Sequence, residues 1–208
     1  MAGATGLIGS QLLELLLADS RYTRVIAISR KPLERVNPKF QNIVADLDTL
    51  GQYKDQLQPD DVYCCLGTTM RMAKTKEAFR RVDFEFPLFL AKLSKEQGAR
   101  QFLIVTALGA NKSSFIFYNR VKGETEGAII ALGFESLHIL RPSLLVGPRV
   151  EHRAGEGAAT WFYNVFGFLI PRKYKAIDSI KVARSMLIFA SQEKKGNFIH
   201  ESIELQNS

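Results

Sequence analysis

Short apolar runs alternate with longer segments of helical periodicity along most of this sequence. The apolar runs predict strands at 25–28, 43–44, 61–66, 102–106, 137–140 and 197–200. The helical periodicity predicts helices at 7–18, 77–97 (bent near Pro87), 117–132, 160–169 and 179–190. Continuously apolar strands are typical of a parallel sheet covered on both faces, and their alternation with helices indicates a doubly wound fold. We therefore predict an α/β protein with a doubly wound, mostly parallel sheet.

Composition is that of a soluble globular chain and excludes several other classes. The 208 residues are 46% hydrophobic and 24% charged, which excludes a disordered chain, a coiled-coil rod and a small disulfide scaffold. The longest apolar stretch, 161–170, is too short for a membrane span and is interrupted by Asn164 and Gly167. We expect one domain over 1–208, with no secretory signal and no membrane partner.

The net charge of +7 favours anionic partners without choosing among them. The basic residues are scattered, and we recognise no nucleic-acid module or stacking platform, so we expect no nucleic-acid partner. Cys64 and Cys65 are adjacent, and neighbouring cysteines rarely pair because the ring is strained. Two reduced, buried thiols predict a cytoplasmic protein.

A glycine-rich opening suggests a phosphate site. Gly3, Gly6 and Gly9 are spaced by three and precede the helix predicted at 7–18. Such glycines permit a tight turn, close approach of a pyrophosphate and close helix packing, and the helix directs free N–H groups at the phosphates. Only Met1 and Ala2 precede the motif, so we expect the first strand to be truncated and the true start to lie upstream. The alternative is a glycine-rich turn without a ligand.

The strand at 25–28 ends in Ser29, Arg30 and Lys31. An NAD-binding domain usually places an acid there to hold the ribose diol. Here an acid is absent, and the Arg30 guanidinium with the Ser29 hydroxyl suits a 2′-phosphate. We therefore predict NADP(H) in preference to NAD(H); the alternative is a solvated turn.

Tyr118 and Lys122 are four residues apart and share one face of a predicted helix. A phenol that exchanges a proton with an alcohol oxygen needs its pKa lowered from about 10, and a neighbouring ammonium does this. Thr106, at the carboxyl end of a strand, is the best hydroxyl to position a substrate carbonyl, and Ser113 or Ser114 are alternatives. A plain surface pair is the competing interpretation of Tyr118 and Lys122.

Other residues give weaker signals. We interpret His138 as a satisfied core histidine, and His152 and His200 as isolated, with no metal site. The aromatic run of 161–168 is read first as a helix over the sheet, with a substrate lid or dimer face as the alternative. A group of basic residues near the expected cleft either selects an anionic substrate or partner or is solvated surface: Arg149, Arg153, Arg172, Lys173 and Lys175.

Several motifs together resemble a known family. They are DVYCCLGTT (61–69), FRRVD (79–83), LGANKSS (108–114), YNRVKGETE (118–126), LRPSLLVGPR (140–149) and GEGAATWF (155–162). With the glycine motif and Tyr-x-x-x-Lys, they resemble the atypical branch of the short-chain dehydrogenase/reductase superfamily, and most closely its Tat-interacting-protein family.

The resemblance implies an NADP(H)-binding Rossmann-like fold and assigns residues to its parts. By position, it implies a pyrophosphate segment of Gly3, Thr5, Gly6, Leu7, Ile8 and Gly9; an adenosine-phosphate pair of Ser29 and Arg30; adenine neighbours Asp46 and Leu47; a ribose and nicotinamide segment of Leu66, Gly67 and Thr68; catalytic Tyr118, Lys122 and Thr106; and nicotinamide neighbours Pro142, Leu144 and Leu145.

Two functional hypotheses follow. The first is an NADP-dependent reductase acting on a small-molecule carbonyl, with about 147–175 and 196–208 forming a substrate-side cap. The second, which the resemblance also implies, is a regulator that binds NADPH without turnover and acts through a protein partner. A homodimer is compatible with both.

Overall fold

The computed structural model describes residues 1–147, 171 and 174–207. The helix predicted at 160–169, its aromatic residues, His152 and the basic residues Arg149, Arg153, Arg172 and Lys173 lie outside these ranges.

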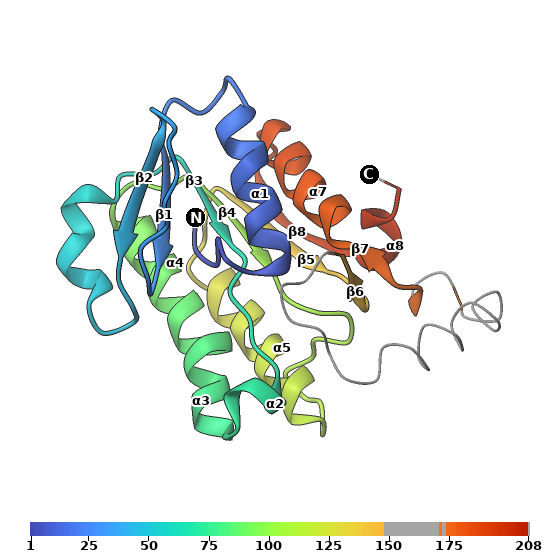
Figure 1. The fold of residues 1–208 in the computed structure, drawn as a ribbon. Coiled ribbons are helices and arrows are strands. Elements are labelled where there is room, and N and C mark those ends of the chain that lie inside the picture. Colours follow the sequence, from blue (N-terminus) through green and yellow to red (C-terminus); the bar gives the residue numbers. More distant parts are fainter. Residues whose placement is uncertain (148–170, 172–173, 208) are drawn as a thin grey trace.

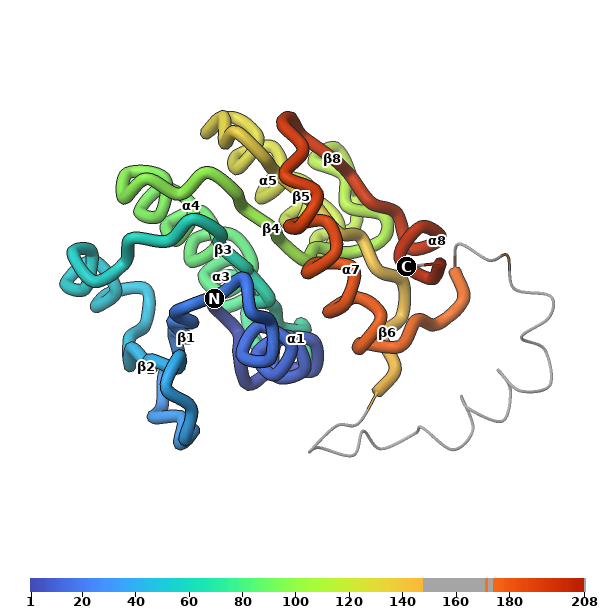
Figure 2. Tube along the Cα trace, turned by 90° about the horizontal axis from the view of Figure 1, so that it is seen from above, coloured from blue at the N-terminus to red at the C-terminus, as the bar shows by residue number. Residues whose placement is uncertain are grey.

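A parallel sheet forms the centre of the molecule (Figure 2). Its strands follow the spatial order β2 (Phe40–Val44), β1 (Val25–Ser29), β3 (Asp61–Cys64), β4 (Gln101–Val105), β5 (Ser136–Arg141) and β8 (Gly196–Glu201). Asp61 pairs with Gln101, Gln101 with Ser136 and Ser136 with Gly196, so the last four strands start level. Their carboxyl ends therefore meet along one edge.

Met1 and Ala2 lie between β1 and β3 and join the two parts of the sheet. Ala2 forms parallel bridges with Ile28 and Cys64. Its N–H donates to Tyr63 O over 2.9 Å, and its carbonyl accepts from the Cys65 N–H over 2.9 Å. The residues before the glycine motif thus occupy the central position where the first strand was expected.

Helices cover both faces of the sheet (Figure 1). α1 (Leu7–Ala18), α7 (Ser179–Ser191) and the short α8 (Ser202–Leu205) lie on one face, where α1 and α7 pack in one hydrophobic cluster with Leu103 and Leu140. α3 (Lys76–Arg80), α4 (Phe86–Glu96) and α5 (Phe117–Ile130) cover the other face. The remaining short elements are η1 (Leu50–Gln56), α2 (Met70–Ala73), β6 (Leu145–Val146) and β7 (Ile177–Asp178). The predicted doubly wound α/β fold is confirmed.

The helix predicted at 77–97 is interrupted before its proline rather than at it. A π-helical turn, η2 (Arg81–Glu85), joins α3 to α4, and Pro87 stands in the first turn of α4. There its missing N–H breaks no helical hydrogen bond. π-helical turns inside helices are often found at functional sites, and this one carries the buried Asp83.

Two sequence-based expectations are corrected here. Residues 196–201, assigned to a cap, instead form the edge strand β8, which confirms the strand predicted at 197–200 and pairs along the whole of β5. The interpretation of His200 as an isolated residue is wrong. Its Nε2 lies 2.9 Å from His138 Nδ1, and its Nδ1 lies 2.8 Å from Glu204 Oε1. His138 is buried in the core as predicted, and burial lowers its pKa to about 4.

Among the residues described, no helix is both long and apolar enough to cross a membrane.

Candidate functional site

The predicted site residues come together at the carboxyl edge of the sheet. The glycine turn follows Ala2, Ser29 ends β1, Leu66 to Thr68 follow β3, and Thr106 follows β4. Open parallel sheets bind ligands at this edge. The fold therefore positions every predicted segment on the same side of the molecule.

The glycine turn is built from close backbone contacts that a side chain would prevent. Gly3 has φ of +85°, and a Cβ on it would lie 2.6 Å from the carbonyl carbon and oxygen of Cys65. A Cβ on Gly9 would lie 2.7 Å from the carbonyl carbon of Gly3, and closer still to its oxygen. Gly3 thus fits against the end of β3, and Gly9 brings α1 against the turn, as the motif predicts.

The N-terminus of α1 is open to an anion. Gly6 is its N-cap residue and has no side chain to cap it, and the first turn contains no acidic residue. Thr5 and Gly6 are exposed. A cavity of about 410 Å³ adjoins them, lined by Ala4, Thr5, Ser10, Leu13 and residues 32–35. Free N–H groups and the helix dipole favour a phosphate here, so these residues fit the pyrophosphate end of a dinucleotide.

Ser29 and Arg30 differ in whether their side-chain hydrogen-bond donors are available to a ligand. The Ser29 hydroxyl donates to Lys31 O over 2.7 Å and accepts from Asn42 Nδ2 over 2.9 Å. Arg30 is exposed beside it. Of the pair, Arg30 is therefore the one whose donors face solvent, while the Ser29 proton is directed to the backbone.

Asp46 shapes the turn after β2. Its Oδ1 accepts hydrogen bonds from the Thr49 hydroxyl over 2.8 Å and from the N–H groups of Thr49 and Asp48. The hydrogen bond from the Thr49 hydroxyl is the main cause that lowers the pKa of Asp46. Leu47, predicted to flank adenine with it, is half-buried.

Tyr118 and Lys122 stand one turn apart on α5 in different environments. Tyr118 is half-buried, and its ring lies against Phe79 with centroids 5.5 Å apart. Lys122 is 4% exposed. Gly123, beside it, lets α5 touch the loop after β4: a Cβ there would lie 2.7 Å from Asn111 Cα.

The Lys122 ammonium is held by Asp83 of the π-helical turn. Its Nζ lies 2.7 Å from Asp83 Oδ1, and the Asp83 side chain is fully buried. Burial is the largest single influence and lowers the pKa of Lys122, but Asp83, Tyr118 and Cys64 together raise that pKa above its ordinary value. The other Asp83 oxygen accepts the Thr68 N–H over 2.9 Å. Lys122 is therefore a cation placed directly beside the predicted Gly67–Thr68 segment.

Thr106 is directed into the protein. Its hydroxyl donates to Glu126 Oε1 over 2.6 Å, and the residue is 5% exposed. Glu126 in turn accepts from Arg141 Nη2 over 2.5 Å and from Arg141 Nε over 3.0 Å. The predicted role of Thr106 in positioning a substrate oxygen stays a prediction, and in this structure its proton is committed to Glu126.

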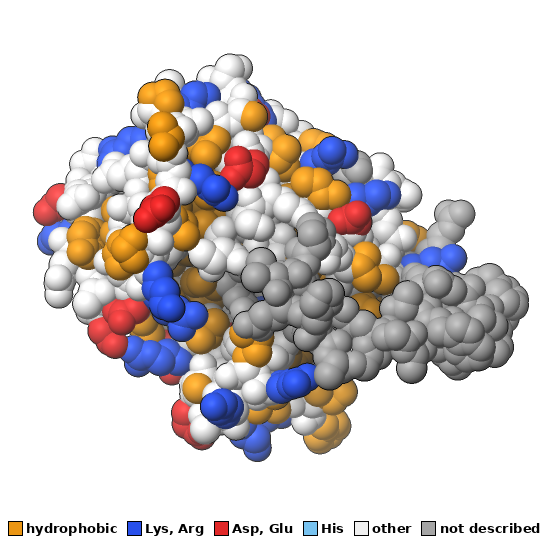
Figure 3. Space-filling model, viewed as in Figure 1, with side chains coloured by type: hydrophobic (Ala, Val, Ile, Leu, Met, Phe, Trp, Pro, Cys, Tyr) orange, Lys and Arg blue, Asp and Glu red, His pale blue; other side chains and the backbone are white. Residues whose placement is uncertain are grey.

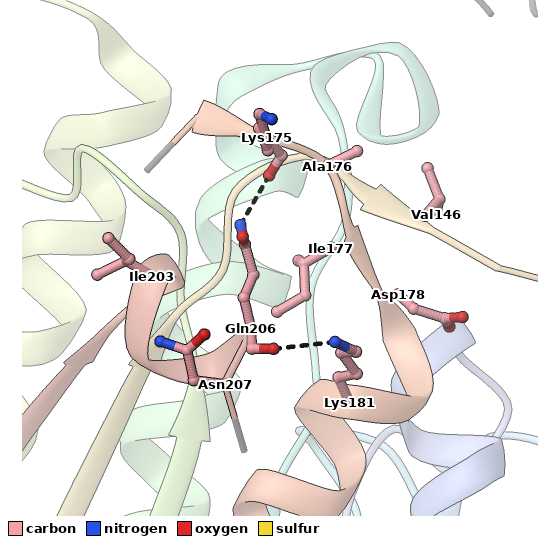
Figure 4. Close-up of a pocket in the computed structure, with 9 residues that line it drawn as sticks. All are labelled: Val146, Lys175, Ala176, Ile177, Asp178, Lys181, Ile203, Gln206 and Asn207. Atoms are coloured by element: carbon pink, nitrogen blue, oxygen red, sulfur yellow. Dashed lines mark hydrogen bonds between the residues drawn. The ribbon is translucent and has the colours of Figure 1, made fainter. Parts of the chain in front are cut away.

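The segment after β5 contributes both buried and exposed groups. Pro142 is buried and its carbonyl accepts the Leu108 N–H over 2.9 Å, while Leu144 is exposed. A second cavity, of about 480 Å³, lies between β6, β7 and α8. Figure 4 shows Gln206 between Lys175 and Lys181: it donates to Lys175 O and accepts from Lys181 Nζ.

The basic residues in the described ranges do not form one patch on the face seen in Figure 3. Lys and Arg side chains are spread there among acidic and hydrophobic ones.

Comparison with known proteins decides the family. The model of the NAD dependent epimerase/dehydratase family matches residues 1–111. The chain belongs to this family. It is 35% identical to Protein HTATIP2 of Rattus norvegicus, over 89% of this chain and 77% of that protein. The resemblance to the Tat-interacting-protein family is thus confirmed, and this member of the epimerase/dehydratase family is an NAD(P)-binding protein of the short-chain dehydrogenase/reductase type.

Solved structures agree on the fold of this epimerase/dehydratase family member. MoeE5 in complex with UDP-glucose and NAD superimposes with a TM-score of 0.73 at 17% identity, covering 95% of this chain and 73% of that one. UDP-glucose 4-epimerase of Thermus thermophilus in complex with NAD gives 0.69 at 16% identity, covering 99% and 80%.

One comparison overturns the expected location. Relatives from Candida albicans and Debaryomyces hansenii are each named "Protein FMP52, mitochondrial"; the first is 33% identical over 93% of this chain and 88% of that protein. The prediction of a cytoplasmic protein is therefore wrong. That prediction was based on two reduced cysteines. Reduced cysteines do not distinguish the cytoplasm from an organelle with a reducing interior.

Sequence reasoning missed Asp83 as a site residue, although a signal was present. Asp83 lies in the run FRRVDFEF, between Val82 and Phe84 and one turn after Phe79. An acid on the apolar face of a helix needs a cationic partner when buried. That rule predicts a cationic partner for Asp83, and the structure shows that the partner is Lys122.

Proposed function

We propose that this protein is an NADP(H)-dependent oxidoreductase that interconverts a small-molecule carbonyl and its alcohol. The observation that carries the proposal is the gathering of an open helix N-terminus, the exposed Arg30 and the Lys122 ammonium along one sheet edge. Anion-binding groups and an acid–base pair at one edge suit a dinucleotide and a reacting oxygen.

The residues that would hold the dinucleotide are those the sequence predicts. Backbone N–H groups of Thr5 and of residues 7–9 would bind the pyrophosphate, since the Gly6 N–H donates to the Gly3 carbonyl. Arg30 would bind the 2′-phosphate, and Lys122 the ribose beside the nicotinamide. When bound, NADP(H) supplies or accepts the hydride. Arg30 suits the extra phosphate because its planar fork matches phosphate oxygens.

Tyr118 would transfer the proton to or from the substrate oxygen. The positive charge of Lys122 stands one helical turn away on α5, in the spacing that the proposed acid–base pair requires. Asp83 keeps that charge in place, since burial alone acts against a charged lysine.

A nucleotide titration tests this proposal. We expect NADPH to bind at least tenfold more tightly than NADH, measured by calorimetry. A panel of carbonyl compounds is then screened for NADPH oxidation, and Tyr118→Phe is expected to abolish the turnover found while leaving NADPH binding within twofold. Failure to bind either nucleotide, or full turnover by Tyr118→Phe, overturns the proposal.

A second candidate is a regulator that binds NADPH and acts through a protein partner. The orientation of Thr106 favours it, because the strand-end hydroxyl that would position a substrate is buried on Glu126. This candidate predicts tight NADPH binding with no oxidation by any carbonyl in the panel. Turnover that depends on Tyr118 excludes it.

The names of the fungal relatives suggest that this protein acts in mitochondria. Subcellular fractionation with an antibody to the chain tests that location.

A further inference from the structure

We propose that Asp83 is the positioning residue of the nucleotide site: it orients the Lys122 ammonium and holds the Gly67–Thr68 backbone through the two oxygens of one carboxylate. The inference rests on the proposed function, because it takes Lys122 as a ligand of the bound dinucleotide.

The carboxylate joins two predicted cofactor segments. One oxygen lies 2.7 Å from Lys122 Nζ, and the other accepts the Thr68 N–H over 2.9 Å. Gly67 lies over the pair: a Cβ there would stand 3.6 Å from Asp83 Oδ1 and 3.6 Å from Lys122 Nζ. The strand-end segment and the lysine are therefore fixed relative to each other by Asp83.

Asp83 is itself held rigidly. The Thr125 hydroxyl of α5 is buried and shares its proton between the Asp83 carbonyl at 2.7 Å and the Val121 carbonyl at 2.8 Å. The π-helical turn of Arg81–Glu85 places the residue between α3 and α4. A side chain that is fully buried and fastened at both its backbone and its carboxylate is suited to positioning.

The pairing leaves the lysine able to bind a ligand. An ammonium carries three N–H donors, so one can point at Asp83 while others point at a ribose diol. The titratable groups facing Lys122 are Asp83 from η2, Tyr118 from α5 and Cys64 from β3. Of these, Asp83 makes the ion pair, with its Oδ1 2.7 Å from Lys122 Nζ, so its removal exposes Lys122 to the effect of burial.

The test compares wild type with three variants by NADPH titration from pH 6 to pH 9. Wild type should bind with nearly constant affinity, since Lys122 stays charged. Asp83→Asn should bind at least tenfold more weakly at pH 7, and its affinity should fall further as pH rises. Asp83→Glu retains the charge but moves it by one methylene, so binding weakens without the added pH dependence. Asp83→Asn combined with Lys122→Met should lose the pH dependence again.

Glu124→Gln is the matched control. Glu124 Oε2 of α5 pairs with Arg80 Nη1 of α3 over 2.5 Å, at a partly exposed position. Its removal takes away an ion pair of α3 with α5 and should leave NADPH affinity within twofold at every pH.

A second readout does not depend on a nucleotide. Nuclear magnetic resonance of the protein labelled at the lysine Cε carbons reports the charge of Lys122, whose signal is assigned by its loss in Lys122→Met. The signal should titrate at lower pH in Asp83→Asn than in wild type.

An unchanged titration, or equal NADPH affinity of wild type, Asp83→Asn and Asp83→Glu, overturns the inference. Absence of nucleotide binding by wild type instead overturns the proposed function. Should Asp83→Asn fail to fold, Asp83→Glu decides: unaltered binding overturns the inference, and weakened binding with a flat pH profile supports it.

Discussion

Gly9 packs its Cα against the carbonyl of Gly3, and no side chain fits between them. We expect Gly9→Ala to lower the free energy of unfolding by about 2 kcal/mol or more, because the turn and α1 must separate. Nucleotide binding should weaken with it. Urea unfolding and calorimetry measure the two effects.

Gly127→Ala is the control for that substitution. Gly127 is also helical, but a Cβ there meets nothing within 4 Å. Alanine should therefore stabilise α5 by about 0.5–1 kcal/mol. Equal stability of Gly9→Ala and wild type would show that the turn adapts and that its close packing is not required.

Arg30→Ala should separate the two dinucleotides. Loss of a charged hydrogen-bonding partner costs about 1.5–3 kcal/mol, which corresponds to roughly 10- to 100-fold in NADPH affinity, while NADH affinity should stay within threefold. Arg24, at the opposite end of β1 and exposed beside Gln41, provides the control Arg24→Ala. Parallel loss of both nucleotides in Arg30→Ala would contradict a 2′-phosphate contact.

Thr106→Val tests what the buried hydroxyl does. Glu126 would lose a hydrogen bond, and we expect about 1–2 kcal/mol less stability with NADPH affinity unchanged. Thr106→Ser should recover most of that stability, because it retains the hydroxyl. If Thr106→Val unfolds at the wild-type urea concentration, the contact with Glu126 contributes nothing.

Acid should destabilise the protein through His138. Burial lowers the pKa of this imidazole from 6.5 to about 4, with the charges of His200 and Lys194 acting in the same direction. Above pH 6.5 the folded and unfolded forms are both neutral and the full stability is present. As pH falls from 6.5 towards 4, His138 binds a proton in the unfolded chain but stays neutral in the folded chain. The free energy of unfolding therefore decreases by up to about 3 kcal/mol.

Urea unfolding at pH 7 and pH 5 measures that decrease. His138→Gln removes the titrating ring and should show a smaller difference between the two pH values. An identical pH dependence in wild type and His138→Gln would assign acid sensitivity to other groups.

The sequence predicted the fold well because its strands are continuous apolar runs and glycines follow the ends of α4 and α5. Gly133, for example, has φ of +69° just after α5, where it was expected to terminate the helix. The sequence predicted a bend near Pro87 but not the π-helical turn of Arg81–Glu85, because such a turn leaves no mark in the apolar periodicity. His200 was missed as the partner of His138, since 62 residues separate them and only the parallel pairing of β5 with β8 brings them together.

The candidate site was predicted in its parts but not in its connections. The spacing of Gly3, Gly6 and Gly9 predicted the close backbone contacts of the turn, and the structure shows these contacts at Gly3 and Gly9. Thr106 was assigned by its place at a strand end, yet which way a side chain points there depends on the buried Glu126–Arg141 pair. Asp83 acts between α5 and the end of β3, a contact that no local pattern contains.

The two adjacent thiols stand where the glycine turn meets β3, and this makes them a natural reporter of that junction. Burial raises the pKa of Cys64 to about 11 and also raises that of Cys65, so few thiolates form at pH 8. A chromogenic disulfide reagent should therefore react slowly with both thiols, and with the buried Cys64 at a rate set by how often the centre of the sheet opens. NADPH should slow that reaction further if its binding stabilises the glycine turn. An unchanged rate would mean that the nucleotide does not change how often this junction opens.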